Sequence, residues 1–458
     1  MNAINRLIGF SFVFFLSQTA LGATIEKISV TTDGKESPSG SHNASISRDG
    51  RYIAFETAGS FDAADTNFEV DIYVRDRLLG ETKRISIGST GEEAHTSSKN
   101  AVISGNGRYV AFETSGSLVS DDTNNDSDVY VHDRQTGETK RISVTSSGEQ
   151  VKTSSGSASI SGNGRYICFE ANGRFEASDT NNNSDIYVHD RQSGETRRIS
   201  VTSSGVGLET SSHNASISAD GRYVSFESNG SFESSDTNGD LDVYVHDRQT
   251  GETRRVSVTT SGGELRSSSR NSSISADGRY VVFDSYGNFE ASDRNVDSDV
   301  YVHNMDTRET TRVSVASEGV EVGTGSDKGS ISADGRYVTF ETYGAFVDGD
   351  RNHDDDVYIH DRKTNKTTLV SVPYRDNMAS FMSYNAIISG DASTVAFETY
   401  GDFNATDLNS NLDVYVRVLD KETEIVSSDA GASGGSLSAS FIISWALFGI
   451  VVRRMRSL

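Results

Sequence analysis

The sequence predicts an all-β protein, a seven-bladed β-propeller built from four-stranded antiparallel blades, and two observations lead to this fold class. First, a seven-residue acidic loop occurs seven times at intervals of 57 residues, with the first copy at Asp65 and the last at Asp407. Second, each interval holds four short runs with the alternation of β-strands. Antiparallel strands repeated in this way are typical of propellers, in which radial repetition protects the sheet edges.

The second repeat shows the expected elements most clearly. We expect strands at residues 100–104, 108–114, 128–133 and 138–144, of which the second and third are rich in aromatic and β-branched residues. No stretch between the two termini has the pattern of a helix. An eighth copy of the fourth strand, residues 25–30, precedes the first repeat. We therefore expect it to close the ring by completing the last blade.

Antiparallel order also predicts two different faces. The turns between the first and second strands and between the third and fourth strands are short and share one face. The acidic loops and the long connections between repeats share the other face, here called the loop face. Binding residues are found disproportionately on loops, so the loop face is the expected working face.

Residues 218–226, with the sequence SADGRYVSF, resemble the core repeat of TolB-type and WD-like propellers. The resemblance spans about residues 24–428 and implies the fold, but it implies little about function. TolB carries an additional N-terminal α/β domain that is not expected here, so its partners are not carried over.

The acidic loops predict a calcium-binding pattern. Position 1 is always Asp, position 3 is Asn, position 5 carries a side-chain oxygen and position 7 is Asp. Oxygens at alternate positions of a tight loop are the ligands that calcium prefers. The candidate metal ligands are Asp65, Asn67, Glu69, Asp71, Asp122, Asn124, Asp126, Asp128, Asp179, Asn181, Asn183, Asp185, Asp236, Asn238, Asp240, Asp242, Asp293, Asn295, Asp297, Asp299, Asp350, Asn352, Asp354, Asp356, Asp407, Asn409, Asn411 and Asp413.

A structural alternative stays open for the same loops. Asp and Asn also form Asx-turns, and duplication copies a structural turn as faithfully as a ligand. The invariant oxygen at position 5 favours calcium, because a turn does not need it. The carboxylates that end the second strands are possible additional ligands: Glu56, Glu113, Glu170, Glu227, Asp284, Glu341 and Glu398.

Five histidines recur at one position of the third strand: His132, His189, His246, His303 and His360. A ring of histidines could bind a transition metal or act as acid and base. A structural hydrogen bond to a neighbouring turn is the favoured interpretation, because the ring should separate many of these residues widely. The Gly-Arg-Tyr turns, such as that of Arg108 and Tyr109, are expected to pack between blades. No repeat introduces a distinct nucleophile, base or metal triad, so no catalytic residue is predicted.

The two ends of the chain have the composition of targeting signals. Residues 1–23 are expected to be a signal peptide, residues 24–428 the propeller and residues 429–436 a linker. Residues 437–458, an apolar segment with a basic tail, are expected to form a helix and resemble a Gly-Gly C-terminal sorting signal of Gram-negative surface proteins. A membrane anchor is the alternative, although the 16-residue apolar run is short for a span of about 20 residues.

These features together predict a secreted or surface-anchored, non-enzymatic, calcium-binding monomer that presents an acidic face to a protein or glycan. The net charge of −24 excludes nucleic acid as an expected partner. One alternative is a secreted polysaccharide lyase or hydrolase with a metal site in the propeller channel, which would need a cluster of unlike polar residues at the channel mouth. The near-equivalence of the repeats argues against it. A second alternative is an envelope scaffold.

Overall fold

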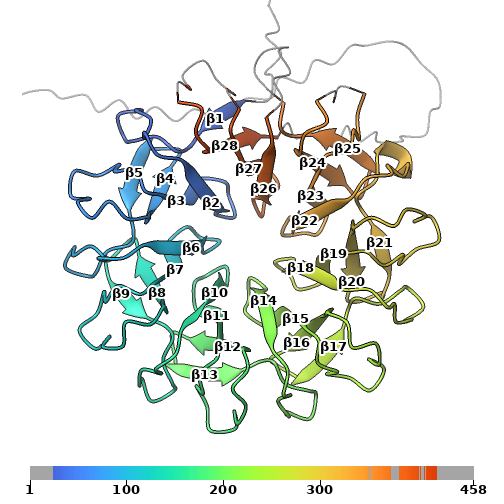
Figure 1. The fold of residues 1–458 in the computed structure, drawn as a ribbon, viewed down its shortest axis with the longest axis horizontal. Coiled ribbons are helices and arrows are strands. Elements are labelled where there is room, and N and C mark those ends of the chain that lie inside the picture. The colour runs from blue at the N-terminus through green and yellow to red at the C-terminus, as the bar shows by residue number, and fades with distance from the viewer. Residues whose placement is uncertain are drawn as a thin grey trace, which may run out of the picture. The chain divides into compact units, whose positions relative to one another are not determined.

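The described part of the chain forms seven four-stranded antiparallel sheets around a common axis (Figure 1). The structure is a computed structural model, and it describes residues 24–348, 350, 352–372, 381–401, 403, 407 and 409–419. Within these residues the only helical element is one 3-10 turn, η1 (Ser317–Gly319). The predicted all-β, seven-bladed propeller is confirmed.

The blades, numbered 1 to 7 in chain order of their first strands, share one strand plan. The innermost strands are β2 (Ser41–Ile46), β6 (Ser98–Ile103), β10 (Ser155–Ile160), β14 (Ser212–Ile217), β18 (Ser269–Ile274), β22 (Ser326–Ile331) and β26 (Ser383–Ile388). The second strands are β3 (Tyr52–Thr57), β7 (Tyr109–Thr114), β11 (Tyr166–Ala171), β15 (Tyr223–Ser228), β19 (Tyr280–Ser285), β23 (Tyr337–Thr342) and β27 (Thr394–Thr399). The third strands are β4 (Asp71–Asp76), β8 (Asp128–Asp133), β12 (Asp185–Asp190), β16 (Asp242–Asp247), β20 (Asp299–Asn304), β24 (Asp356–Asp361) and β28 (Asp413–Val418). The outermost strands are β5 (Glu81–Arg84), β9 (Thr139–Arg141), β13 (Glu195–Arg198), β17 (Glu252–Arg255), β21 (Thr310–Arg312), β25 (Lys366–Leu369) and β1 (Ile25–Lys27).

Blade 7 is closed by the N-terminal strand, as predicted. Strand β1 pairs antiparallel with β28, with Ile25 opposite Arg417. The hydroxyl of Ser29 then donates a hydrogen bond of 2.6 Å to Asp413, which fixes the strand from outside its ladder. The competing C-terminal copy, residues 422–428, lies outside the described residues, as do the expected signal peptide, the linker and the apolar C-terminal segment.

The hydrophobic core is divided into seven clusters that lie between neighbouring blades. One cluster joins Ile72 and Val74 of blade 1 to Val110, Phe112 and Tyr130 of blade 2, all at most 1% exposed. A residue on a twisted blade therefore packs against the next blade as well as its own sheet. The ring is thus held by burial at each blade boundary, including the boundary between blades 7 and 1.

The Gly-Arg-Tyr turns, which lie at the start of the second strands on the face opposite the loop face, join neighbouring blades. The Arg134 guanidinium stacks 4.1 Å from the ring centroid of Tyr52 in the preceding blade. Gly107 has φ +68°, and a Cβ there would lie 2.2 Å from the Tyr52 ring. Arg108 forms a two-point contact with Asp133 of its own blade, at 2.8 and 2.6 Å. The predicted packing of these turns between blades is confirmed.

Two local departures from the expected strands matter for the loop face. The fourth strand of blade 2 is shorter than residues 138–144, because the chain leaves the ladder after Arg141 and Val144 bridges instead to Gln150. Each innermost strand also contains an irregularity after its second residue, as between Lys99 and Val102.

Along the described residues, no helix has the length and apolarity needed to cross a membrane.

Candidate functional site

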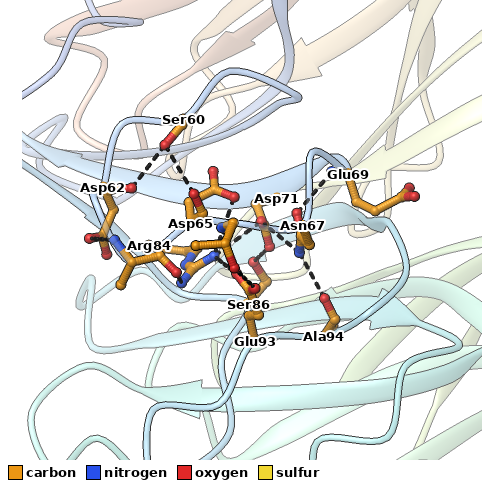
Figure 2. Close-up of polar contacts among 12 residues, drawn as sticks. Ser60, Asp62, Asp65, Asn67, Glu69, Asp71, Arg84, Ser86, Glu93 and Ala94 are labelled. Carbon is orange, nitrogen blue, oxygen red and sulfur yellow. Dashed lines mark hydrogen bonds and ion pairs between the residues drawn. The ribbon is translucent and has the colours of Figure 1, made fainter.

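Each acidic loop is folded by its own polar side chains, as blade 1 shows in Figure 2. The Asn67 side-chain oxygen accepts the backbone N–H of Glu69 at 2.8 Å, which is an Asx-turn. The Asn67 amide donates to the carbonyl oxygen of Ala94 at 2.7 Å, so the acidic loop is joined to the long connection beside it. This bond confirms that the two kinds of loop share one face.

An arginine occupies the position among the carboxylates that a cation would take. The side chain of Arg84 is 2% exposed, and its Nη1 lies 3.6 Å from Asp65, 3.4 Å from Asp71 and 2.8 Å from Glu93. Asp65 also accepts the Tyr73 hydroxyl at 2.7 Å. The carboxylates at positions 1 and 7, which the sequence suggested as calcium ligands, are therefore brought together around a guanidinium of the same blade.

The same arrangement recurs in most blades. The equivalent cations, each with at least one ion pair to its loop, are Arg84, Arg141, Arg198, Arg255 and Arg312, with Lys27 in blade 7. Sequence analysis missed this cation because it lies on the outermost strand, more than ten residues from the loop. Its fixed place in the repeat was the available signal.

In blade 1 the residue at position 5 does not complete a ligand set. Figure 2 shows the Glu69 carboxylate pointing away from the cluster of Asp65, Arg84 and Asp71. Glu69 instead accepts the Ser97 hydroxyl at 2.7 Å. Among the described residues there is no group of three or more His, Cys, Asp or Glu side chains arranged to hold a metal ion.

Blade 6 differs from the other blades at this cluster. Leu369 stands at the place of the arginine, and no ion pair to the described loop residues replaces it. The Asp354 Oδ2 atom is buried without a hydrogen-bond partner. The pKa of Asp356 is raised to about 6, chiefly by burial and in smaller part by the neighbouring charges of Asp350 and Asp354. Arginine-containing loops share the raised pKa, as at Asp128, so the feature that distinguishes blade 6 is the leucine in place of the buried guanidinium.

The carboxylates that end the second strands serve the ring and not the acidic loops. Glu56 accepts the backbone N–H of Asn100, which belongs to the innermost strand of the next blade, at 2.5 Å. Glu398 closes the ring by accepting the N–H of Asn43 at 2.6 Å. Burial raises the pKa of Glu56, Asp284 and Glu341 to about 7. The glutamates link one blade to the next on the loop face, as Glu341 does by accepting the N–H of Ala386, whereas Asp284 accepts from Arg270 and Asn271 of its own blade.

The five histidines make structural hydrogen bonds, as favoured from the sequence. In blade 2, His132 Nδ1 lies 2.8 Å from the Thr139 hydroxyl, which donates to the Ile87 carbonyl oxygen of blade 1 at 2.6 Å. Burial lowers the pKa of His132 to about 4, and the other four behave alike. These histidines are therefore uncharged at neutral pH and serve as hydrogen-bond partners of the threonines.

Two positions on the inner side of the loop face differ between blades, and sequence analysis did not single them out. The second residues of the innermost strands, here called the inner-rim residues, are His42, Lys99, Gly156, His213, Arg270, Asp327 and Tyr384. The residues that follow the second strands, here called the strand-exit residues, are Ala58, Ser115, Asn172, Asn229, Tyr286, Tyr343 and Tyr400. The near-equivalence of the repeats therefore fails at this rim.

Comparisons with known proteins support the fold alone. No protein-family model matches the sequence, and no curated protein does so either. An oligogalacturonate lyase in complex with manganese is similar, with a TM-score of 0.52 and 13% identity over 87% of this chain and 97% of that chain. The β-propeller domain of the trilobed protease from Pyrococcus furiosus gives a TM-score of 0.51 and 12% identity over 83% of this chain and 93% of that domain. TolB from Acinetobacter baumannii gives a TM-score of 0.38 and 12% identity over 81% of this chain and 80% of that chain.

Proposed function

We propose that the protein is a non-enzymatic binding protein of the cell surface that presents its loop face to a protein or glycan partner. The observation that supports this function is the contrast within the loop face. The acidic loops keep Asp, Asn and Asp at positions 1, 3 and 7 in every blade, whereas the seven inner-rim residues are of six types and the seven strand-exit residues are of four types. A surface maintained only for folding would be expected to repeat at both places.

Export and anchoring are part of the same proposal, and they rest on the sequence of the two ends. Fractionation of cells that express the protein with and without residues 434–458 tests this part. Release into the medium on truncation is the expected result. An unchanged location would contradict surface anchoring by this segment.

Calcium binding is proposed for the blade 6 loop alone, with Asp350, Asn352, Asp354 and Asp356 as the ligands. The leucine at position 369 supports this choice, because it stands where the other blades place a cation beside the loop carboxylates. The carboxylates must move closer together on binding, since the described residues form no ready metal group. In the other loops an arginine or lysine already supplies the positive charge.

Leu369→Arg tests the calcium proposal. It would supply the guanidinium that the other blades contain, and we expect it to abolish both the heat of calcium binding and any loss of melting temperature in EDTA. Arg312→Leu, which makes blade 5 resemble blade 6, is the matched variant and should create a second site. A wild-type protein that neither binds calcium in calorimetry nor responds to EDTA would contradict the proposal.

A polysaccharide lyase is the second candidate function, because the inner rim contains the unlike polar residues that the sequence analysis required of an enzyme. His42, Lys99, His213, Arg270 and Asp327 bring potential acids, bases and electrophilic groups to one face. A lyase forms a carbon–carbon double bond in its product, so rising ultraviolet absorbance during incubation with polygalacturonate would favour it. A flat trace with intact binding would favour the binding protein.

A further inference from the structure

Three of the strand-exit residues differ from the other four because they are exposed tyrosines. The strand-exit residues Tyr286, Tyr343 and Tyr400 belong to the consecutive blades 5, 6 and 7, and they are 53%, 52% and 43% exposed. Blades 1 to 4 carry Ala58, Ser115, Asn172 and Asn229 at the same places. Three adjacent exposed rings are a large apolar contribution to one face, and such patches mark interaction sites.

Within blade 5 and at the boundary between blades 6 and 7, tyrosine rings lie beside cationic side chains. The Arg270 guanidinium lies 5.6 Å from the ring centroid of Tyr286 in blade 5. In blade 6, the ammonium of Lys328 lies 5.8 Å from the ring centroid of Tyr384 in blade 7. Tyr384 in turn lies 6.4 Å, centroid to centroid, from Tyr400. We name the set Tyr286, Tyr343, Tyr384, Tyr400, Arg270 and Lys328 the tyrosine arc.

Buried carboxylates hold the two cations of the arc in place. Arg270 Nε lies 3.1 Å from Asp284, whose side chain is fully buried, while the Arg270 side chain is 42% exposed. Lys328 Nζ lies 3.3 Å from Glu341, which is 6% exposed, while Lys328 is 46% exposed. An approaching ligand therefore meets the donor groups and the rings before it meets the carboxylates. Both donors stay fixed by charge-assisted hydrogen bonds.

We propose that the tyrosine arc is the ligand-binding site of the loop face and that its ligand is a polysaccharide chain. This inference rests on the proposed binding function and names its ligand class. A sugar ring has an apolar face and a border of hydroxyl groups. Exposed tyrosine rings offer a flat apolar surface with a polar tip, and Arg270 and Lys328 offer donors beside them. Tyrosine and arginine are also enriched in protein-binding hot spots, so a protein partner is the competing outcome of the test.

Affinity electrophoresis of the purified protein in gels containing polygalacturonate, xylan or dextran tests the site. We expect retardation by at least one of them, and an affinity at least tenfold weaker for the triple variant Tyr286→Ala, Tyr343→Ala, Tyr400→Ala. The matched control is Ser115→Ala, Asn172→Ala, Asn229→Ala, which changes the same positions in blades 2 to 4. All six side chains lie on the rim, so melting temperatures should confirm that both variants fold.

A second measurement separates the failure of this inference from the failure of the proposed function. The labelled protein is bound to outer-membrane fragments of a Gram-negative bacterium treated with periodate or with protease. Loss of binding after periodate supports the polysaccharide. Binding that only protease removes, or polysaccharide binding that the triple variant retains, would overturn the tyrosine arc as a glycan site while leaving the binding function. No binding to any gel or fragment would overturn both.

Discussion

The acidic loops and the inner rim lie on the same face but follow opposite rules. The loops repeat in all seven blades, and most of them enclose a cation from their own blade, as Arg84 does for Asp65 and Asp71. The inner rim changes from blade to blade and leaves its side chains partly exposed. In this protein, regular repetition marks the residues that build the ring, whereas departure from the repeat marks the residues available for a partner.

The largest expected effect comes from removing a loop cation. Arg198 is 3% exposed and lies 3.2 Å from Asp179 and 2.7 Å from Asp185. Arg198→Met should lower the free energy of unfolding by about 3–5 kcal/mol, because two buried carboxylates lose their partner. Arg197→Met, at the preceding residue, is the control. The Arg197 side chain is 68% exposed, and its ion pair with Glu195 contributes less than about 1 kcal/mol. Equal effects in urea unfolding would contradict the structural role of the loop cation.

A smaller loss is expected where one blade touches the next. Gly164 has φ +74°, and a Cβ there would lie 2.1 Å from the Tyr109 ring of the preceding blade. Gly164→Ala should cost about 3 kcal/mol, from overpacking together with left-handed strain. Gly194→Ala carries the strain alone, since φ is +77° and nothing lies within 4 Å. Its cost should be about 1 kcal/mol, and thermal unfolding that does not distinguish the two variants would refute the blade contact.

The buried carboxylates that end the second strands should make the stability of the protein depend on pH. The pKa of Glu56 is raised by burial to about 7, above its value in the unfolded chain. The folded state therefore binds the proton more tightly, and the stability that Glu56 contributes falls as the pH rises from about 4.5 to about 7 and is constant above. The stability difference between the wild type and Glu56→Gln should shrink by on the order of 2 kcal/mol between pH 5 and pH 7.5. The buried histidines change the stability in the opposite direction, but both proteins contain them, so their effect cancels in the comparison. A stability difference that does not change with pH would exclude the raised pKa of Glu56.

The smallest effect is expected at the inner rim. Lys99 is exposed on the innermost strand of blade 2, where it lies opposite Glu113. Lys99→Ala should change the free energy of unfolding by less than about 0.5 kcal/mol, because it removes neither burial nor a cap. Chemical denaturation measures this, and a loss as large as that of Gly164→Ala would show that the rim also holds the fold.

The sequence by itself determined the fold, the blade count and the closing strand. A period of 57 residues, four strand-like runs per period and an eighth fourth-strand copy leave few other arrangements, because each strand must pair and each apolar face must be covered. The Asx-turn at Asn67 was also foreseeable, since Asn bonds the backbone two residues ahead wherever the loop is tight.

Only the tertiary structure decided what the acidic side chains contact. Arg84 reaches Asp65 from the outermost strand, and Glu56 reaches Asn100 in the next blade. Neither partner is close in sequence, so the spacing of oxygens along one loop could not distinguish a calcium ligand from the acceptor of an arginine. The tyrosine arc has the same origin: Lys328 of blade 6 lies beside Tyr384 of blade 7, and Tyr384 lies beside Tyr400, because the ring places these blades side by side (Figure 1).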